Sequence, residues 1–174
     1  MKPRVYLGGP VTQEDWRLEL VPGLRQLRWA EHYIELPSFT YLGPFYTPER
    51  QTCGEATWEY GPESGHLADV LWEKEETGPS MGRKNKYGFS RADLYFTYVT
   101  KPWTLEWISE VTLGIPDTTR VVLSVSPDAW SPNLAQIVPR AHRIHRARDR
   151  NRLRSDFEFE IMEIGGGLLF GDVT

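Results

Sequence analysis

Two glutamates in the segment "WTLEWISEVTLGIPDTTRVVLSV", residues 103–125, carry side chains that could take part in a reaction. Glu106 and Glu110 lie four residues apart in a stretch rich in tryptophan and aliphatic residues, directly before a predicted strand. A carboxylate beside an aromatic surface can act as a nucleophile toward an electrophilic carbon, or as a general acid or base. The alternative is that both residues are solvated side chains on the flank of a helix, because carboxylates in such positions are often merely structural.

Glu106 and Glu110 differ in their angular distance from the apolar face of the predicted helix. At about 100° per residue, the apolar side chains of the segment form one arc, which comprises Trp103, Trp107, Ile108, Val111 and Ile115. Glu110 lies about 20° outside the edge of this arc, and Glu106 lies about 60° outside it. We therefore expect Glu110 to be the partly buried carboxylate and the better candidate for chemistry.

Buried strands that alternate with helices would hold this segment in place. Apolar runs predict strands at residues 4–9, 33–36, 93–99 and 120–125. Helices are expected after the first strand, with a bend at Pro22 and Gly23, at residues 66–76 and 83–92, and in the glutamate segment up to Gly114. This alternation predicts an α/β fold of the flavodoxin-like or Rossmann-like type, with a parallel sheet of about five strands and helices on both faces.

Ligands of such sheets bind beyond the carboxyl ends of the strands. The glycines Gly8 and Gly9 follow the first strand, and we expect them to share this edge with the loops after Val99 and Val125. Glycines at such a turn indicate a close approach of the backbone to a ligand or to a neighbouring element. The sequence lacks the glycine and lysine patterns of dinucleotide and nucleoside triphosphate sites.

Two further segments have less regular patterns. Residues 37–65 have no helical period and read as a long loop, whose aromatic residues could stack on a planar ring or simply pack the loop: Tyr41, Phe45, Tyr46, Trp58 and Tyr60. The tail "FEFEIMEIGGGLLF" at 157–170 alternates like an edge strand and then loosens at its glycines.

Composition excludes several classes of partner. The 174 residues fit a single domain spanning 1–174, and the net charge of −4 does not favour nucleic acid or an anionic membrane. Cys53 has no second cysteine to pair with, no run is long enough for a membrane span, and no zinc-ligand spacing is present, so we expect a cytoplasmic protein without a metal. The seven arginines within residues 140–154 could hold phosphates, or could lie on a solvated helix or at a subunit contact.

Taken together, four motifs resemble the nucleoside 2-deoxyribosyltransferase family, which includes related nucleotide N-glycosidases. The resemblance runs from Val5 to about Ala135. It rests on "YLGGPVTQEDWR" near the N-terminus, on "RADLYFTYV" with Ala92 and Asp93, on the spacing from Thr104 to Glu110 to Val121, and on Asn133 in "SPNLAQ". The third motif is the most specific of the four.

The resemblance implies a function and a site. Glu110 would attack C1′ of a 2′-deoxynucleoside, release the base and leave a covalent glycosyl-enzyme that a second base captures, without any cofactor. Thr104 would orient Glu110 or contact the sugar, and Asn133 would reach a sugar hydroxyl across a subunit interface, so a homo-oligomer is expected. The remaining candidates for binding the nucleoside are Tyr6, Gly8, Gly9, Trp16, Phe45 and Asn85.

One departure from the family pattern keeps two alternatives open. Asn85 stands where the family usually has an aspartate that helps to protonate the base, and an amide cannot deliver that proton at neutral pH. The chain could therefore be an N-glycosidase that hydrolyses nucleoside 5′-monophosphates, with Arg17 or an arginine from residues 140–154 on the phosphate. It could also be a nucleoside- or nucleotide-binding module without turnover.

Overall fold

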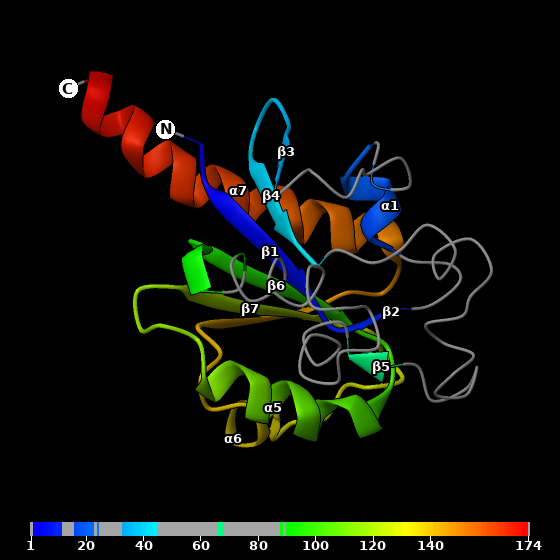
Figure 1. Ribbon diagram of the computed structural model, residues 1–174. Coiled ribbons are helices and arrows are strands. Elements are labelled where there is room, and N and C mark those ends of the chain that lie inside the picture. Colours follow the sequence, from blue (N-terminus) through cyan, green and yellow to red (C-terminus); the bar gives the residue numbers. More distant parts are fainter. Residues whose placement is uncertain are drawn as a thin grey trace, which may run out of the picture.

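The central feature of the computed structural model is a six-stranded sheet (Figure 1). The structure describes residues 2–11, 16–22, 24, 33–44, 66–67, 88 and 90–173. The strand order is β3-β4-β1-β6-β7-β8, and every neighbouring pair is parallel except β3 with β4. The strands are β1 Arg4–Gly8, β3 Ile34–Glu35, β4 Thr40–Gly43, β6 Leu94–Val99, β7 Arg120–Val125 and β8 Arg143–Arg146.

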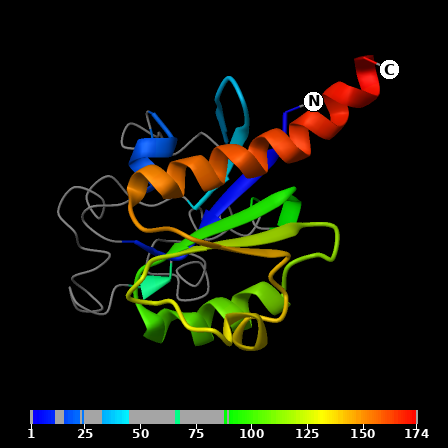
Figure 2. The same cartoon turned by 180° about the vertical axis from the view of Figure 1, so that it is seen from behind.

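Helices cover both faces of this sheet (Figures 1 and 2). The short α1 (Arg17–Leu20) and the long α7 (Arg150–Val173) lie on one face, whereas α5 (Leu105–Leu113) and α6 (Leu134–Ile137) lie on the other. A 3-10 turn, η3 (Pro102–Thr104), leads into α5, and a separate two-stranded ribbon joins β2 (Pro10–Val11) to β5 (His66–Leu67). The expected α/β architecture with a mostly parallel sheet is confirmed.

Alternating side chains divide the strands between two cores. On β7, Val122 packs with residues of α1 and α7, whereas Val121 and Leu123 pack with residues of α5 and α6. The same division holds on β6, where Phe96 faces α7 and Tyr95 faces α5. Because successive side chains of a strand point to opposite faces, a strand buried on both sides must be apolar throughout, as the prediction from continuous apolar runs assumed.

Four predicted elements are wrong or incomplete. The segment read as a loop at 37–65 contains β4, the second parallel strand of the sheet, and residues 33–36 contribute only the short edge strand β3. The tail expected to form an edge strand belongs to helix α7, and the arginine run contains strand β8 before α7 begins. His66 and Leu67 form β5 instead of starting a helix, while the rest of that expected helix lies outside the described residues.

The remaining boundaries agree well with the expected ones. Strand β7 has the predicted bounds, and α5 ends before Gly114, as the glycine and the following proline indicated. Among the described helices, none combines the length and apolar character that a bilayer crossing requires.

Candidate functional site at the carboxyl edge of the sheet

The strand order reverses at one position on the carboxyl edge of the sheet, and we call this position the crevice. The chain passes from β1 outward to β4 and then returns to place β6 on the other side of β1. The helix after β1 lies on one face and the helix after β6 lies on the other, so the two connections diverge at this point (Figure 1). Ligands of open α/β sheets bind where the strand order reverses in this way. The crevice between the ends of β1 and β6 is therefore the candidate site.

Gly8 and Gly9 form the β1 side of this crevice, and both positions are tightly enclosed. A Cβ atom on Gly8 would lie 2.1 Å from the hydroxyl oxygen of Tyr95, whose buried ring stacks on Tyr6. Gly9 has a φ of 107°, which side-chain-bearing residues rarely adopt, and its Cβ would lie 2.6 Å from Oγ1 of Thr97. Gly8 thus makes room for a neighbouring ring, and Gly9 makes room beside a hydroxyl group.

Thr97 is a site candidate that the sequence reasoning missed. Its side chain is fully buried near the end of β6, and its Oγ1 atom has no hydrogen-bond partner within the described part of the chain. A buried hydroxyl group without a partner costs roughly 1–3 kcal/mol, so such a group in a crevice is a candidate contact for a ligand. The signal was present in the sequence, because Thr97 is the one aliphatic hydroxyl in the otherwise apolar and aromatic strand "LYFTYV".

Glu110 lies on the solvent side of α5. The buried face of this helix consists of Leu105, Ile108 and Thr112, and Glu110 is exposed, as is Glu106. The expected partial burial of Glu110 is therefore wrong for this chain. The apolar arc was misplaced because it left out the buried Leu105 and included Trp103 and Trp107, which are both exposed.

The exposed tryptophans make a local aromatic surface on α5. Trp103 and Trp107 are 42% and 40% exposed, and their rings meet edge to face with centroids 6.4 Å apart. Residues three or four positions apart are neighbours on a helix, so Trp107 borders Glu110. Glu110 therefore combines free access from solvent with an adjacent indole, a combination suited to a carboxylate that must reach an uncharged ring-bearing substrate.

Thr104 has a structural partner. Its buried Oγ1 donates to the carbonyl oxygen of Lys101 at 2.8 Å and so closes the turn that starts the helix. Six residues at about 100° each place Thr104 and Glu110 about 120° apart around the axis, on different faces. Contact of Thr104 with Glu110 is thus not made in this structure, although the backbone of Thr104 lies at the carboxyl edge.

The other candidates from β1 and its helix lie in the core. Tyr6 is fully buried against Tyr95, and Trp16 is 5% exposed, with its indole against Phe96. Arg17, named above as a possible phosphate ligand, is also fully buried. Its Nε donates to the carbonyl of Leu7 at 2.6 Å and its Nη2 donates to that of Gly9 at 3.0 Å. Arg17 therefore fixes the end of β1 and is not accessible to a phosphate.

The last group of candidates is only partly covered by the structure. Asn133 is exposed just before α6, and its side chain contacts the hydroxyl group of Ser131. Its position after β7 puts it on the same face of the sheet as α5. Phe45 and Asn85 lie outside the described residues.

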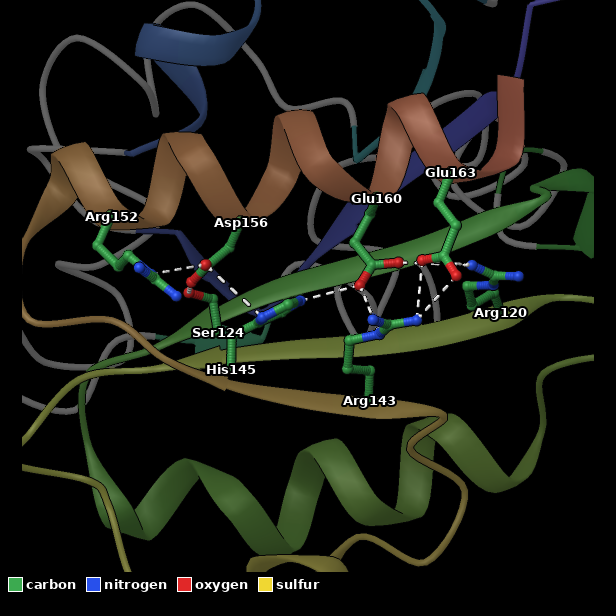
Figure 3. A network of polar contacts seen from close by, with 8 residues as sticks. All are labelled: Arg120, Ser124, Arg143, His145, Arg152, Asp156, Glu160 and Glu163. Carbon is green, nitrogen blue, oxygen red and sulfur yellow. Dashed lines mark hydrogen bonds and ion pairs between the residues drawn. The ribbon is translucent and has the colours of Figure 1, made fainter. Parts of the chain in front are cut away.

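A second group of ionisable side chains lies between the sheet and α7, away from the crevice (Figure 3). Nε2 of His145 lies 2.9 Å from Oε1 of Glu160, and Nε of Arg143 lies 3.0 Å from the same oxygen. Burial opposes ionisation of Glu160, but the hydrogen bond with His145 and the charges of Arg143, His145 and Arg120 together hold the pKa of Glu160 below its usual value. The group includes Ser124, which hydrogen-bonds to Asp156 at 3.1 Å.

This buried network does not have the arrangement of a catalytic triad. Ser124 contacts the carboxylate of Asp156 and not the imidazole of His145, so no base is placed to activate its hydroxyl group. Its members pair with one another across the contact between β7, β8 and α7, which gives them a role in docking the helix.

Metal chemistry has no candidate residues in the described part of the chain, where no three His, Cys, Asp or Glu residues are grouped to hold an ion. Comparisons of the chain with models of known protein families, with curated proteins and with solved structures each found no match.

Proposed function

We propose that the protein transfers a 2-deoxyribosyl group between nucleobases, with Glu110 as the nucleophile. The observation that carries the proposal is the position of α5, which starts directly after β6 at the point where the strand order reverses. The four sequence motifs that resemble the nucleoside 2-deoxyribosyltransferases fall on β1, β6, α5 with β7, and the segment before α6. Gly8, Gly9 and Thr104 lie at the carboxyl edge of the sheet, whereas Asp93 of the second motif lies at the amino end of β6 and pairs with Arg4.

The proposed reaction has two balanced steps. The Glu110 carboxylate attacks C1′ of the deoxynucleoside, the bond between C1′ and the base nitrogen breaks, and that nitrogen takes up a proton from water as the base leaves. A nitrogen of the second base then attacks C1′, gives up its proton, and releases the Glu110 carboxylate. Both steps pass through a cation-like sugar, which a neighbouring carboxylate stabilises electrostatically.

The surroundings of Glu110 fit an uncharged, ring-bearing substrate. Trp107 offers an indole beside the carboxylate, and aromatic surfaces of this kind stack on bases or cover the face of a sugar. At the carboxyl ends of β6 and β1, Thr97 has a buried hydroxyl group without a partner among the described residues, and Gly9 packs closely beside it. A sugar hydroxyl is the kind of group that would complete the hydrogen bonding of Thr97.

A base-exchange assay on two matched variants tests the proposal. Glu110→Ala should lower the rate of exchange between a deoxynucleoside and a free base at least about a thousandfold, because removal of a covalent nucleophile leaves only residual rates. Glu106→Ala, one turn earlier on the same exposed side, should keep the rate within about twofold. Both variants should retain the unfolding temperature of the wild type, since both carboxylates are exposed. An active Glu110→Ala variant would refute the proposal.

Hydrolysis is separated from transfer in the same assay. If water captures the glycosyl-enzyme, free deoxyribose accumulates with or without an acceptor base, whereas transfer yields a new nucleoside only when the acceptor is present. Ligand binding without either product in the wild type would identify a binding module and contradict the enzymatic proposal.

A further inference from the structure

An arginine-lined hollow lies at the carboxyl ends of β7 and β8. Its volume is about 520 Å3, and it is lined by Pro127, Arg146, Arg148 and Arg152. The three arginines come from the end of β8, from the following connection and from the first turn of α7. The hollow thus shares the carboxyl edge of the sheet with the crevice but opens at a different pair of strands, two strand positions from the gap between β1 and β6.

The guanidinium groups that line the hollow keep donors available. Arg146 lies over the indole of Trp130, with 5.1 Å between its Cζ atom and the ring centroid. Stacking occupies the flat face of a guanidinium and leaves the N–H groups at its edge for an acceptor. Arg152 contacts Asp156 through Nε at 3.0 Å, and this geometry leaves its two Nη groups for another partner.

Among the three arginines, Arg148 has the guanidinium that is most available to a ligand. Its side chain is exposed, and within residues 90–173 and the other described ranges no carboxylate or carbonyl lies within bonding distance of its guanidinium. Two arginines that follow Arg148 in the chain do have an acidic partner. Arg150 and Arg154 pair with Glu19 at 2.7 and 3.8 Å. Glu19 on α1 therefore pairs with arginines outside the hollow. Among those inside it, Arg152 pairs with Asp156, whereas Arg148 has no ion pair among the described residues.

One further polar group lies close to the hollow. Ser126 directly precedes Pro127, is 7% exposed, and its Oγ atom lacks a hydrogen-bond partner among the described residues. The N-terminus of α7 already has an anionic cap, because the carboxylate of Asp149 accepts from the backbone N–H of Arg152 at 2.9 Å.

We propose that this hollow binds the phosphate group of a small phosphorylated ligand. Planar guanidinium groups match the oxygens of a phosphate in pairs, and three of them in a concave surface provide more donors than a singly charged carboxylate accepts. The inference does not depend on the proposed glycosyl transfer, because none of the arginines contacts Glu110 and the hollow follows β7 and β8 instead of β6.

Calorimetric titration of the full chain tests the inference at an ionic strength of about 0.15 M, where non-specific attraction is largely screened. The probes are inorganic phosphate, 2′-deoxyadenosine 5′-monophosphate and, as the unphosphorylated control, 2′-deoxyadenosine. We expect inorganic phosphate and the nucleotide each to bind saturably, and we expect added inorganic phosphate to displace the nucleotide. Equal affinities would identify free phosphate as a sufficient ligand, and tighter binding of the nucleotide would identify a phosphate monoester. Failure of both phosphorylated probes to bind would overturn the proposal.

Matched variants locate the binding. Arg148→Gln should weaken phosphate binding about tenfold or more, because it removes charge-assisted hydrogen bonds. Arg154→Gln removes one positive charge from α7, outside the hollow, and should change the affinity less than about twofold. Equal weakening by the two variants would show attraction to net charge only and would refute a defined site.

Two other variants separate this site from the rest of the molecule. Arg148→Lys keeps the charge but loses the planar fork, so its affinity should fall between those of the wild type and Arg148→Gln. Glu110→Ala should bind phosphate as the wild type does. Loss of base exchange with retained phosphate binding would thus leave this inference standing whatever the fate of the proposed reaction.

Discussion

Nε2 of His145 on β8 lies 2.9 Å from Oε1 of Glu160 on α7, and Glu160 is completely buried. The imidazole and two arginines, Arg143 and Arg120, surround this carboxylate from the sheet side (Figure 3). A carboxylate in such a position stays charged only because its neighbours offset the loss of hydration. The stability of the protein should therefore depend on this one group.

Glu160→Gln should lower the free energy of unfolding by about 3 kcal/mol at pH 7, because it leaves the arginines opposite an uncharged amide in a buried contact. Glu163→Gln is the matched control on the same helix. Its carboxylate also pairs with Arg143 and Arg120, but it is 37% exposed, so its loss should cost less than about 1 kcal/mol. Urea unfolding of both variants measures the difference, and equal losses would contradict the special role of Glu160.

The pH dependence of stability follows from the same carboxylate. Its native pKa lies below the usual value of 4.5, so around that pH the unfolded chain binds more protons than the native one. The stabilisation is therefore fully present above about pH 4.5 and is lost as the pH falls through the lower native pKa. Urea unfolding between pH 3 and 7 should show a shallower acid-side decline in Glu160→Gln than in the wild type, and parallel curves would argue against this assignment.

Gly8→Ala should destabilise the protein by about 1–3 kcal/mol, because the added methyl group would meet the ring of Tyr95, which is held against Tyr6 and cannot swing into solvent. Gly114→Ala provides the control. Its new methyl group would find only the carbonyl oxygen of Val111 at 3.5 Å, and its φ of −85° suits alanine, so a neutral or slightly stabilising effect is expected. Thermal unfolding distinguishes the two, and an unchanged Gly8→Ala would mean that Tyr95 has room to move.

Thr97→Val should raise the free energy of unfolding by about 1 kcal/mol, because it replaces an unpaired buried hydroxyl group with a methyl group of similar size. Thr119→Val should have the opposite effect, since Oγ1 of Thr119 donates to the carbonyl of Ala92 at 2.8 Å. If Thr97 contacts the substrate, the stabilised Thr97→Val variant should also show a raised KM in base exchange. A destabilised Thr97→Val variant would reveal a partner for this hydroxyl group.

Much of the sheet could be predicted because its inner strands are buried on both faces. The run "RVVLSV" is apolar enough to identify β7 with its bounds, and Gly114 with Pro116 marks the end of α5 by local backbone chemistry alone. Strand β4 was missed because four residues between prolines and glycines carry too little pattern, and pairing with β1 is what makes them a strand.

The tail of the chain shows why a local period can mislead. "FEFEIMEI" alternates like a strand, yet Leu153, Phe157 and Ile161 also recur every four residues, as on one face of a helix. These three side chains are the ones that pack on the sheet. Similarly, tryptophan was taken as a sign of burial on α5, whereas the face toward the core was decided by Leu105 and Ile108. The position of Glu110 relative to Gly9 and Thr97 depends on strand order, which spacing along the chain does not contain.

The contacts of α7 also restrict how this helix can sit on the sheet. Phe157 and Ile161 pack on the apolar side chains of β1 and β6, while Glu160 meets Arg143 on β8. Sliding the helix by one turn would bring Ile161 to the position of Phe157, but it would also bring Ile164 to the position of Glu160. The half-buried Arg143 and Arg120 would then lose the Glu160 carboxylate. The charged contacts of α7 with the sheet thus select one register of the helix, whereas its apolar contacts alone would allow several.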